Sequence, residues 1–317
     1  MPALSSTPSD QSSPAVPLVA VVGATAAGKT ALSLDLAERL GGEIVNTDAM
    51  QLYRGMDIGT AKLPEREWRG VPHHLVDVLD VTEPATVAEY QGWARDVIAR
   101  LRAAGTVPIL VGGSALYTRA LVDRFEFPGT DPALRARLER DLDSFGAAAL
   151  HRRLAGVDPV AAERIEPENG RRIVRALEVV ELTGRPFRAR LPVQQYVDPH
   201  TVQIGVDIDR ETLDARIEQR VEQMFEAGLV AEVEGLIGRG LLRSRTAAAA
   251  IGYQEVAAYL AGDLTLAEAK LKTVAKTRRF ARRQDAWFRK DPRVVWVRHD
   301  DPERVEKAVA AVRRLVP

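Results

Sequence analysis

Eight consecutive residues near the start of the chain have the types and spacing of a phosphate-binding loop. They match the pattern G-x-x-x-x-G-K-[ST] and are Gly23, Ala24, Thr25, Ala26, Ala27, Gly28, Lys29 and Thr30. In such a loop, successive backbone N–H groups and a helix N-terminus converge on anionic oxygens. Lys29 is expected to lie against the phosphates, and the Thr30 hydroxyl is expected to hold Mg²⁺. The pattern predicts binding of a diphosphate or polyphosphate, although a glycine-rich turn without a ligand would match it too.

Asp48 is the carboxylate best placed to act on a molecule held by this loop. It ends a second apolar segment, Glu43–Asp48, and the carboxyl ends of neighbouring strands in a doubly wound sheet open on one crevice. A carboxylate there could take a proton from an attacking amine or hydroxyl, or bind Mg²⁺ through water. The alternative is an aspartate that ends a strand because aspartate favours turns.

The elements that must position these residues form a βαβ unit. The apolar pattern predicts a strand at Leu18–Gly23, a helix at Lys29–Leu40 and a strand at Glu43–Asp48, with a right-handed parallel crossover. Three further apolar runs, Val107–Val111, Thr201–Asp209 and Val294–Arg298, suit a sheet covered on both faces. The fold class predicted is therefore α/β, with a doubly wound parallel sheet around the phosphate loop.

A helical insertion is predicted within this core. Between the third and fourth strands the pattern becomes helical and charged, with Asp131-Pro132 and Asp158-Pro159 each typical of a helix start and a further helix over Glu168–Leu182. The predicted domains are a tail at 1–17, a core at 18–125 and 198–317, and an insertion at 126–197. Other predicted helices span Val87–Ala104, Arg210–Ala227, Val230–Gly238 and Tyr253–Ala261, and a long basic helix follows Thr265.

Composition excludes several classes of protein. The chain has 317 residues, is 46% apolar and contains no cysteine, so it can bury a full core but can form no disulfide or thiolate metal site. Residues 1–17 are rich in serine and proline, which predicts a disordered tail and no targeting signal. No apolar stretch has the ~20 residues that a membrane span needs. We therefore expect a cytoplasmic protein with no membrane partner. A monomer is also expected, although no feature of the sequence specifies the oligomeric state.

The net charge is zero, but basic residues gather near the C-terminus. Between Lys270 and Lys290 the single acid is Asp285, and Lys272, Lys276, Arg279 and Arg283 recur at the spacing of one helix face. Such a stripe can bind a polyanion locally, and the nearby Gln284 and Trp287 could bond to or stack on bases. The alternative for each basic residue is a solvated helix face.

The segment from Asp48 to Lys62 predicts a long loop, because it has no helical or strand period. Its sequence, DAMQLYRGMDIGTAK, and the phosphate loop before it resemble those of tRNA dimethylallyltransferases, also called isopentenyl transferases. The resemblance covers nearly everything from Leu18 to Arg298 and continues in the segments His73–Asp77, Val111–Tyr117, Arg171–Glu178, Ile217–Arg220, Ile251–Tyr253 and Arg283–Arg289. The chain departs from the usual family pattern at Ala49, Ser114 and Ala115, where serine, threonine and glycine are common.

The resemblance implies transfer of a dimethylallyl group from dimethylallyl diphosphate to N6 of adenosine 37 in the anticodon loop of tRNA, a base that must first be turned out of its stack. By similarity, Lys29, Arg220 and Mg²⁺ at Thr30 would stabilise the leaving diphosphate, and Asp48 would orient N6 and take its proton. The residues expected to contact tRNA on the same basis are Asp48, Ala49, Met50, Gln51, Ser114, Arg135, Arg171, Arg172, Arg175, Gly252, Tyr253, Arg279, Arg282, Arg283, Gln284, Trp287 and Arg289.

Three rival functions remain on the residues alone. A small-molecule or nucleotide kinase fits the loop and core, but kinases usually need a further acid on Mg²⁺, and the third strand ends in Gly112-Gly113. An isopentenyltransferase acting on free adenine nucleotide would need neither the insertion nor the basic helix. A non-enzymatic RNA-binding module would leave the phosphate loop unexplained.

Overall fold

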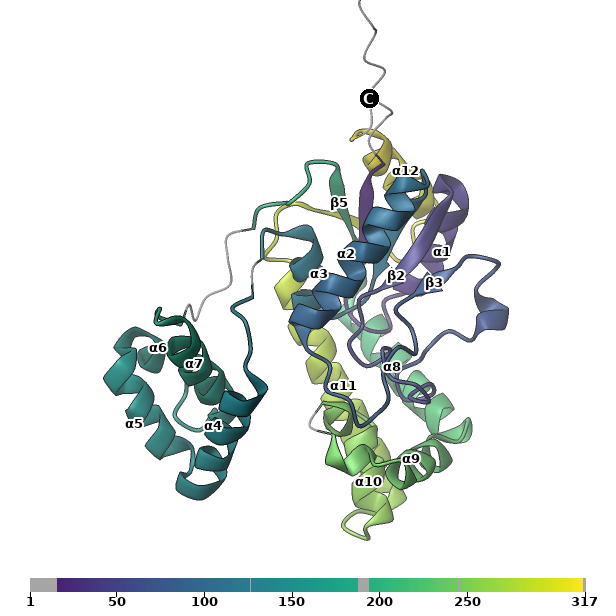
Figure 1. Cartoon of the computed structure of the whole chain (residues 1–317). Coiled ribbons are helices and arrows are strands. Elements are labelled where there is room, and N and C mark those ends of the chain that lie inside the picture. Colours follow the sequence, from purple (N-terminus) through teal and green to yellow (C-terminus); the bar gives the residue numbers. More distant parts are fainter. Residues whose placement is uncertain (1–15, 126, 188–193, 245, 316–317) are drawn as a thin grey trace, which may run out of the picture. The chain divides into compact units, whose positions relative to one another are not determined.

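The computed structural model describes residues 16–125, 127–187, 194–244 and 246–315. Two compact units make up the structure: one runs to Asp123 and resumes at Gln195, and the other spans Arg124–Gln194. Both are shown in Figure 1. The helical insertion expected at 126–197 overlaps the second unit over 126–194. Residues 1–15, most of the expected tail, lie outside the described residues.

The first unit is built on a six-stranded sheet in the order β3-β2-β4-β1-β5-β6. Every neighbouring pair of strands is parallel, which confirms the doubly wound α/β class. The strands are β1 Leu18–Val22, β2 Gly42–Asn46, β3 His73–His74, β4 Val107–Val111, β5 Thr201–Asp207 and β6 Val294–Arg298. All five residues of β1 are buried, as expected for a central strand covered on both faces.

Helices cover the two faces of this sheet. Val19 and Val21 of β1 share a buried cluster with α1 (Lys29–Leu40) and α12 (Arg304–Arg313). Their neighbours Ala20 and Val22 share the other cluster with α2 (Val87–Ala103) and α3 (Ala115–Val122). This alternation follows from the period of two of a strand. The register aligns Val21 with Val111, so β1 and β4 end at the same edge.

The remaining helices of the first unit follow β5. They are α8 Arg210–Glu226, α9 Leu229–Gly238, α10 Tyr253–Leu260 and α11 Leu266–Phe288, with short 3₁₀ turns at Leu241–Arg243 and Ala247–Ala249. A further 3₁₀ turn, Glu65–Glu67, lies between β2 and β3. The long helix α11 packs against α8 and α10 (Figure 1). Its start is the expected capping box, in which Thr265 accepts a hydrogen bond from the Glu268 N–H at 3.2 Å.

The second unit is wholly helical. It contains α4 Pro132–Phe145, α5 Ala147–Val157, α6 Pro159–Arg164 and α7 Gly170–Thr183, packed on a core that includes Leu138, Leu154 and Ile173. Both expected aspartate caps are confirmed: Asp131 accepts from two N–H groups at the start of α4, and Asp158 accepts from the Ala161 N–H. Each proline occupies the first turn of its helix, where no N–H is needed.

Some boundaries differ from the expectation for local reasons. Strand β2 stops at Asn46, before Asp48, because the Asn46 side chain bonds to the backbone of Asp48 and forms a turn. Strand β5 stops at Asp207, because Asp209 accepts from the Thr212 N–H and caps α8. The short strand β3 and the helices α3, α5 and α12 were not expected from the pattern.

None of the helices in the described parts of the chain is both long and apolar enough to cross a membrane.

Candidate active site

The phosphate loop joins the buried strand β1 to helix α1. Gly23 has φ +135°, and a Cβ there would lie 3.2 Å from the Val206 carbonyl oxygen of β5. Gly28 has φ +105° and immediately precedes α1, so only glycine suits that turn easily. Ala26 also has a positive φ, of 64°, which is costly for a residue with a Cβ. The loop is therefore held in a specific curled conformation by its surroundings.

Lys29 lies inside the curve of this loop. Its ammonium group donates to the carbonyl oxygens of Gly23 at 3.1 Å and Ala24 at 2.8 Å. Desolvation lowers the pKa of Lys29 to about 8, with the Asp48 charge raising it and the Arg220 charge lowering it further. Lys29 and Arg220, expected to act on the donor, and Asp48, expected to act on the acceptor, thus form one electrostatic cluster.

Asp48 lies in this cluster with a perturbed carboxyl group. Burial raises the pKa of Asp48, while the Met50 N–H, the Lys29 charge and the Gln51 N–H lower it in part. The Met50 N–H donates to Asp48 Oδ1 at 2.9 Å, and this bond fixes the carboxylate. Ionisable groups whose pKa values are shifted by burial and by neighbouring charges are typical of active sites.

The turn that carries Asp48 is held from two sides. Asn46 bonds to both the N–H and the carbonyl of Asp48, at 2.8 and 3.0 Å. The buried Tyr90 hydroxyl of α2 donates to the Asn46 carbonyl at 2.7 Å. The Ser114 hydroxyl accepts from the Ala49 N–H at 3.4 Å, so Ser114 lies against the segment expected to meet the acceptor. Burial raises the pKa of Tyr90 well above its usual value, and the neighbouring Tyr117 and the Asp48 charge raise it further.

Two glycines after β4 let other elements approach the crevice. A Cβ on Gly112 would lie 2.8 Å from the Asp48 nitrogen, and one on Gly113 would lie 2.1 Å from Nε2 of Gln284. Gly112 thus admits the Asp48 turn, and Gly113 admits a side chain from α11. In the sequence, these two glycines were noted only because they stand where a kinase would have a second acidic residue. Their role in admitting Asp48 and Gln284 was not predicted.

Helix α8 brings two arginines to the phosphate loop. Arg220 donates to the Thr25 hydroxyl at 3.4 Å, and Arg216 donates to the Ala27 carbonyl at 3.5 Å. Desolvation lowers the pKa of Arg220, and the charge of Arg216 adds to the effect. Arg220 was expected here, whereas Arg216 was not. Its position four residues before Arg220, on the same helix face, is the signal that could have found it.

Thr30 fits the proposed Mg²⁺ site by the chemistry of its side chain. Its hydroxyl is exposed at the start of α1 and makes no hydrogen bond to any described residue. Across the same residues, no group of three or more His, Cys, Asp and Glu could hold a metal ion. A single hydroxyl suits Mg²⁺, which keeps several waters and is held largely by substrate phosphates.

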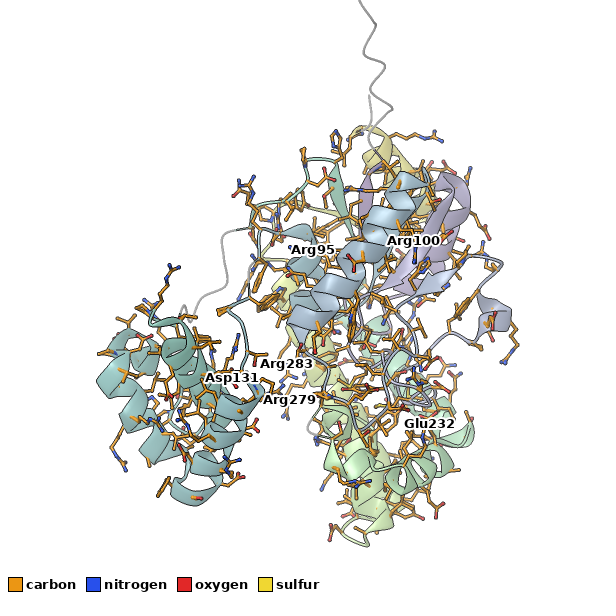
Figure 2. All side chains as sticks on the ribbon, in the orientation of Figure 1. Arg95, Arg100, Asp131, Glu232, Arg279 and Arg283 are labelled. Carbon is orange, nitrogen blue, oxygen red and sulfur yellow. The ribbon has the colours of Figure 1, made fainter. Side chains whose placement is uncertain are left out.

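The loop from Asp48 to Lys62 is ordered by charged groups from outside it. Glu232 of α9, labelled in Figure 2, accepts from the N–H groups of Asp57, Ile58 and Gly59 at 3.1, 2.7 and 3.2 Å. It also accepts from the Tyr253 hydroxyl at 2.5 Å. Tyr253, expected to contact tRNA, is fully buried, so its side chain has partners inside the fold.

Hydrogen bonds between residues of this loop order it further. Lys62 donates to the Tyr53 carbonyl at 3.0 Å and to the carboxylates of Asp57 and Asp77 at 2.6 Å. Gln51 donates to the Thr60 carbonyl at 3.1 Å. Lys62 and Glu232 were not singled out from the sequence, because a charged residue in a loop or on a helix surface gives no sign of its partner.

The basic residues of α11 divide by what they contact. Arg282 pairs with Asp214 at 3.1 Å, and Arg289 pairs with Asp285 at 2.9 Å and with Asp207. Arg279 and Arg283 are exposed, project from α11 in Figure 2, and form no ion pair with any residue that the structure describes. Trp287 is 38% exposed. Arg279, Arg283 and Trp287 are therefore the members of the expected set on this helix whose side chains are available to a ligand.

The arginines of the helical unit are less available than expected. Arg135 and Arg175 both pair with Glu178, which is fully buried, and Thr130 donates to the same carboxylate at 2.5 Å. Burial alone would raise the pKa of Glu178, but these hydrogen bonds lower it overall. Arg171 and Arg172 are exposed at the start of α7. Arg135 and Arg175 thus have a structural role, the pairing of a buried carboxylate, that the sequence did not suggest.

The sequence profile described as IPP transferase matches residues 51–291. The chain belongs to this family.

Individual relatives agree with this assignment. The chain is 70% identical over 296 residues to a protein of Nocardioides sp. named tRNA dimethylallyltransferase, covering 93% of this chain and 96% of that one. It is 61% identical over 293 residues to a protein of the same name from Streptomyces coelicolor, covering 92% and 94%. A crystal structure of a tRNA isopentenylpyrophosphate transferase from Bacillus halodurans matches with a TM-score of 0.69 and 40% identity, over 95% of this chain and 97% of that one.

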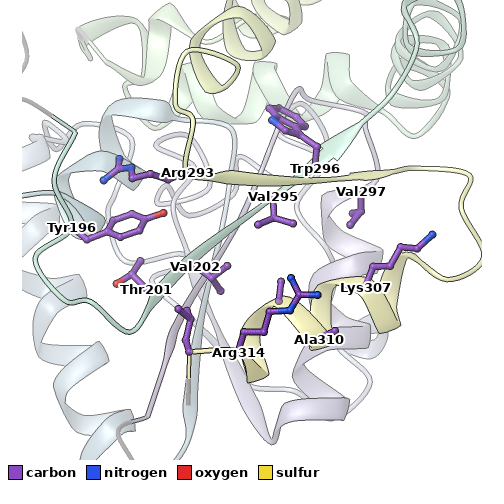
Figure 3. Close-up of a pocket in the computed structure, with 12 residues that line it drawn as sticks. Tyr196, Thr201, Val202, Arg293, Val295, Trp296, Val297, Lys307, Ala310 and Arg314 are labelled. Atoms are coloured by element: carbon purple, nitrogen blue, oxygen red, sulfur yellow. The ribbon is translucent and has the colours of Figure 1, made fainter. Parts of the chain in front are cut away.

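A hollow of about 570 Å³ in this IPP transferase family member lies away from the phosphate loop. Figure 3 shows it between the edge strand β6 and α12, lined by residues that include Thr201, Arg293 and Arg314. Its lining includes no residue of the phosphate loop, and β5 separates the edge strand β6 from β1. Ligands of doubly wound sheets bind at the carboxyl edge. The hollow is therefore not the donor site.

Proposed function

We propose that this IPP transferase family member transfers a dimethylallyl group from dimethylallyl diphosphate to N6 of adenosine 37 in tRNA. The observation that carries the proposal is the cluster of Lys29, Asp48 and Arg220 beside a phosphate loop. It combines positive groups for a departing anion with a carboxyl group able to take a proton. The names of close relatives support the same reaction.

The donor is held by its diphosphate. Backbone N–H groups at the start of α1 and the Lys29 ammonium bind the phosphate oxygens, in place of the carbonyl oxygens that Lys29 now contacts. As the bond between the allylic carbon and oxygen breaks, charge grows on the diphosphate, and Lys29, Arg220 and Arg216 stabilise it. Arg216 and Arg220 are already held against the loop by α8, so these two side chains need little reorganisation.

The acceptor amine is handled by Asp48. The adenine base must leave its stack before N6 reaches the crevice. Asp48 accepts a hydrogen bond from N6, directs it to the allylic carbon and takes its proton as the new carbon–nitrogen bond forms. Because an exocyclic adenine amine is a poor nucleophile, much of the rate comes from positioning and from stabilising the leaving group.

Mg²⁺ at Thr30 would supply further positive charge to the diphosphate oxygens when bound. Its place in the site is supported by the exposed Thr30 side chain at the start of α1, whose hydroxyl bonds to none of the residues that the structure describes.

The remaining contacts with tRNA come from exposed charge. Arg279 and Arg283 on α11 offer exposed guanidinium groups that form no ion pair with the described residues, and Trp287 offers an aromatic face on the same helix. Arg171 and Arg172 supply exposed charge in the helical unit. Together they would bind the phosphates near the anticodon loop and add a stacking contact.

The test is incubation with labelled dimethylallyl diphosphate, Mg²⁺ and unmodified tRNA. We expect label in the RNA, at N6 of adenosine 37, as located by nuclease digestion and mass spectrometry. A matched anticodon stem-loop with guanosine 37 should take no label. Label on free adenine nucleotides alone, or phosphate transfer from ATP run in parallel, would identify one of the two rival activities and overturn the proposal.

A further inference from the structure

Gln284 joins the phosphate loop to the end of strand β4. Its side-chain carbonyl accepts from the Thr25 N–H at 2.8 Å, and its amide nitrogen donates to the Gly113 carbonyl at 2.9 Å. The residue is 5% exposed, so both ends of its side chain are used inside the protein. The sequence had suggested Gln284 as a residue that bonds to an RNA base.

The surroundings are shaped to fit this side chain. Gly113 leaves the amide its space, since a Cβ there would lie 2.1 Å from Nε2 and 3.0 Å from the side-chain carbonyl carbon of Gln284. The hydroxyl of Thr25 is held separately, by Arg220 at 3.4 Å. The Gln284 side chain thus forms a specific hydrogen-bonded bridge between the phosphate loop and the end of β4.

We propose that Gln284 is a positioning residue for the allylic diphosphate, acting through the first turn of the phosphate loop, and that it makes no contact with tRNA. This inference rests on the proposed function of the same site.

The physical reason lies in the strain of the loop. Ala26, next to Thr25, has a positive φ, and a loop in such a conformation persists only when its surroundings hold it. Fixing Thr25 at the start sets the path of the N–H groups that follow, which are those that bind the donor. Without the bridge, the loop must be ordered when the donor binds, and affinity for the diphosphate falls.

Arg283, the residue before Gln284, has a different environment and is expected to bind a different ligand. Arg283 is exposed on the outer side of α11, whereas Gln284 faces the phosphate loop. Neighbouring residues of one helix thus serve different ligands, because they are about 100° apart around its axis. Changes at Arg283 should alter binding of tRNA, and changes at Gln284 should alter binding of the donor.

The experiment is a double-mutant cycle with Gln284→Ala and Gly113→Ala. Gly113→Ala displaces the Gln284 amide without removing it, so both single variants break the same bridge. The affinity of the full-length protein for inorganic diphosphate with Mg²⁺ is measured by calorimetry, and tRNA affinity is measured separately. Gln223→Ala, an exposed glutamine on α8, is the matched control, and thermal unfolding checks that each variant is folded.

We expect each single variant to weaken diphosphate binding about tenfold, with the double variant no weaker than either and tRNA affinity unchanged. The KM for dimethylallyl diphosphate should rise by a similar factor. Losses that multiply in the double variant, or a loss of tRNA affinity with normal diphosphate binding, would overturn the inference. If one single variant does not fold, the other still decides by its diphosphate affinity.

The two proposals fail in different ways. A wild-type protein that binds diphosphate but places no label in tRNA would disprove the proposed function, while the cycle on diphosphate binding could still be completed.

Discussion

The crevice at the carboxyl edge of the sheet and the outer side of α11 are both rich in charge, but they hold it differently. In the crevice, Lys29 and Asp48 are partly buried and have shifted pKa values. On α11, Arg279 and Arg283 are exposed and form no ion pair within the described structure. Perturbed groups of the first kind are typical of chemistry, and open charge of the second kind is typical of binding to a polyanion.

The arginines expected to bind tRNA differ in whether they already form an ion pair inside the protein. Arg282, Arg289, Arg135 and Arg175 were expected to bind tRNA together with Arg279 and Arg283, yet each of the first four has an acidic partner in the structure. A basic sequence therefore predicts where charge gathers, but not how much of it is left for a ligand.

The largest effect should come from Asp48→Asn in the crevice. The amide keeps an oxygen for the Met50 N–H but cannot take a proton, so transfer should fall about 10³-fold. Single-turnover transfer to tRNA measures this rate, and filter binding should show unchanged tRNA affinity. Equal loss of both activities would mean that Asp48 holds the structure together instead of acting on the amine.

The shifted pKa values of the crevice predict how kcat/KM for the donor depends on pH. Asp48 must be ionised to accept a proton, so kcat/KM for the donor should fall on the acidic side at a pH above the usual range of an aspartate. Lys29 must be protonated to bind the donor, so kcat/KM should also fall as the pH rises through about 8.

Lys29→Arg tests the alkaline part of this profile. An arginine stays charged, so the alkaline decline should disappear even if the rate is lower throughout. Persistence of the decline in this variant would show that another group controls it. Because the two groups interact, the profile reports apparent values of the pair.

A smaller effect is expected on the outer side of α11. Replacing Arg279 and Arg283 together by alanine should weaken tRNA binding and lower the slope of log K against log salt by up to about two, since each lost phosphate contact removes ~0.7–0.9. Titrations at several salt concentrations measure the slope. The paired residues Arg282 and Arg289, changed together, should lower it less, and the reverse order would contradict the distinction drawn from their ion pairs.

The smallest effect on transfer should come from the helical unit. Arg135→Ala leaves the buried Glu178 with fewer partners and should destabilise this unit by about 1–3 kcal/mol, as measured by its unfolding in denaturant. Arg171→Ala, at an exposed position, should leave its stability unchanged. A stable Arg135→Ala variant that no longer binds tRNA would restore Arg135 to the set of direct contacts.

Local patterns sufficed for much of the fold in both units. The phosphate loop, the strands Val107–Val111 and Val294–Arg298 and the aspartate caps of α4 and α6 depend on residues close together in the chain, and each was expected at its observed place. The two-residue strand β3 was not, because it is too short to show a period.

Local sequence patterns predicted only part of the candidate site. Lys29 follows from the phosphate-loop pattern, and Asp48 follows from the rule that strands of a parallel sheet end at one edge. The Gln284 bridge and the contact of Glu232 with Asp57–Gly59 could not be foreseen, because each links segments far apart in the chain.

Local sequence patterns limited the chemistry of this protein to binding of a diphosphate or polyphosphate beside a carboxylate and a basic helix, because each of these patterns has a fixed physical meaning. Which arginines form ion pairs inside the protein depends instead on the folded structure. That division depends on long-range partners, such as Glu178 for Arg135 and Asp214 for Arg282, which no local pattern specifies.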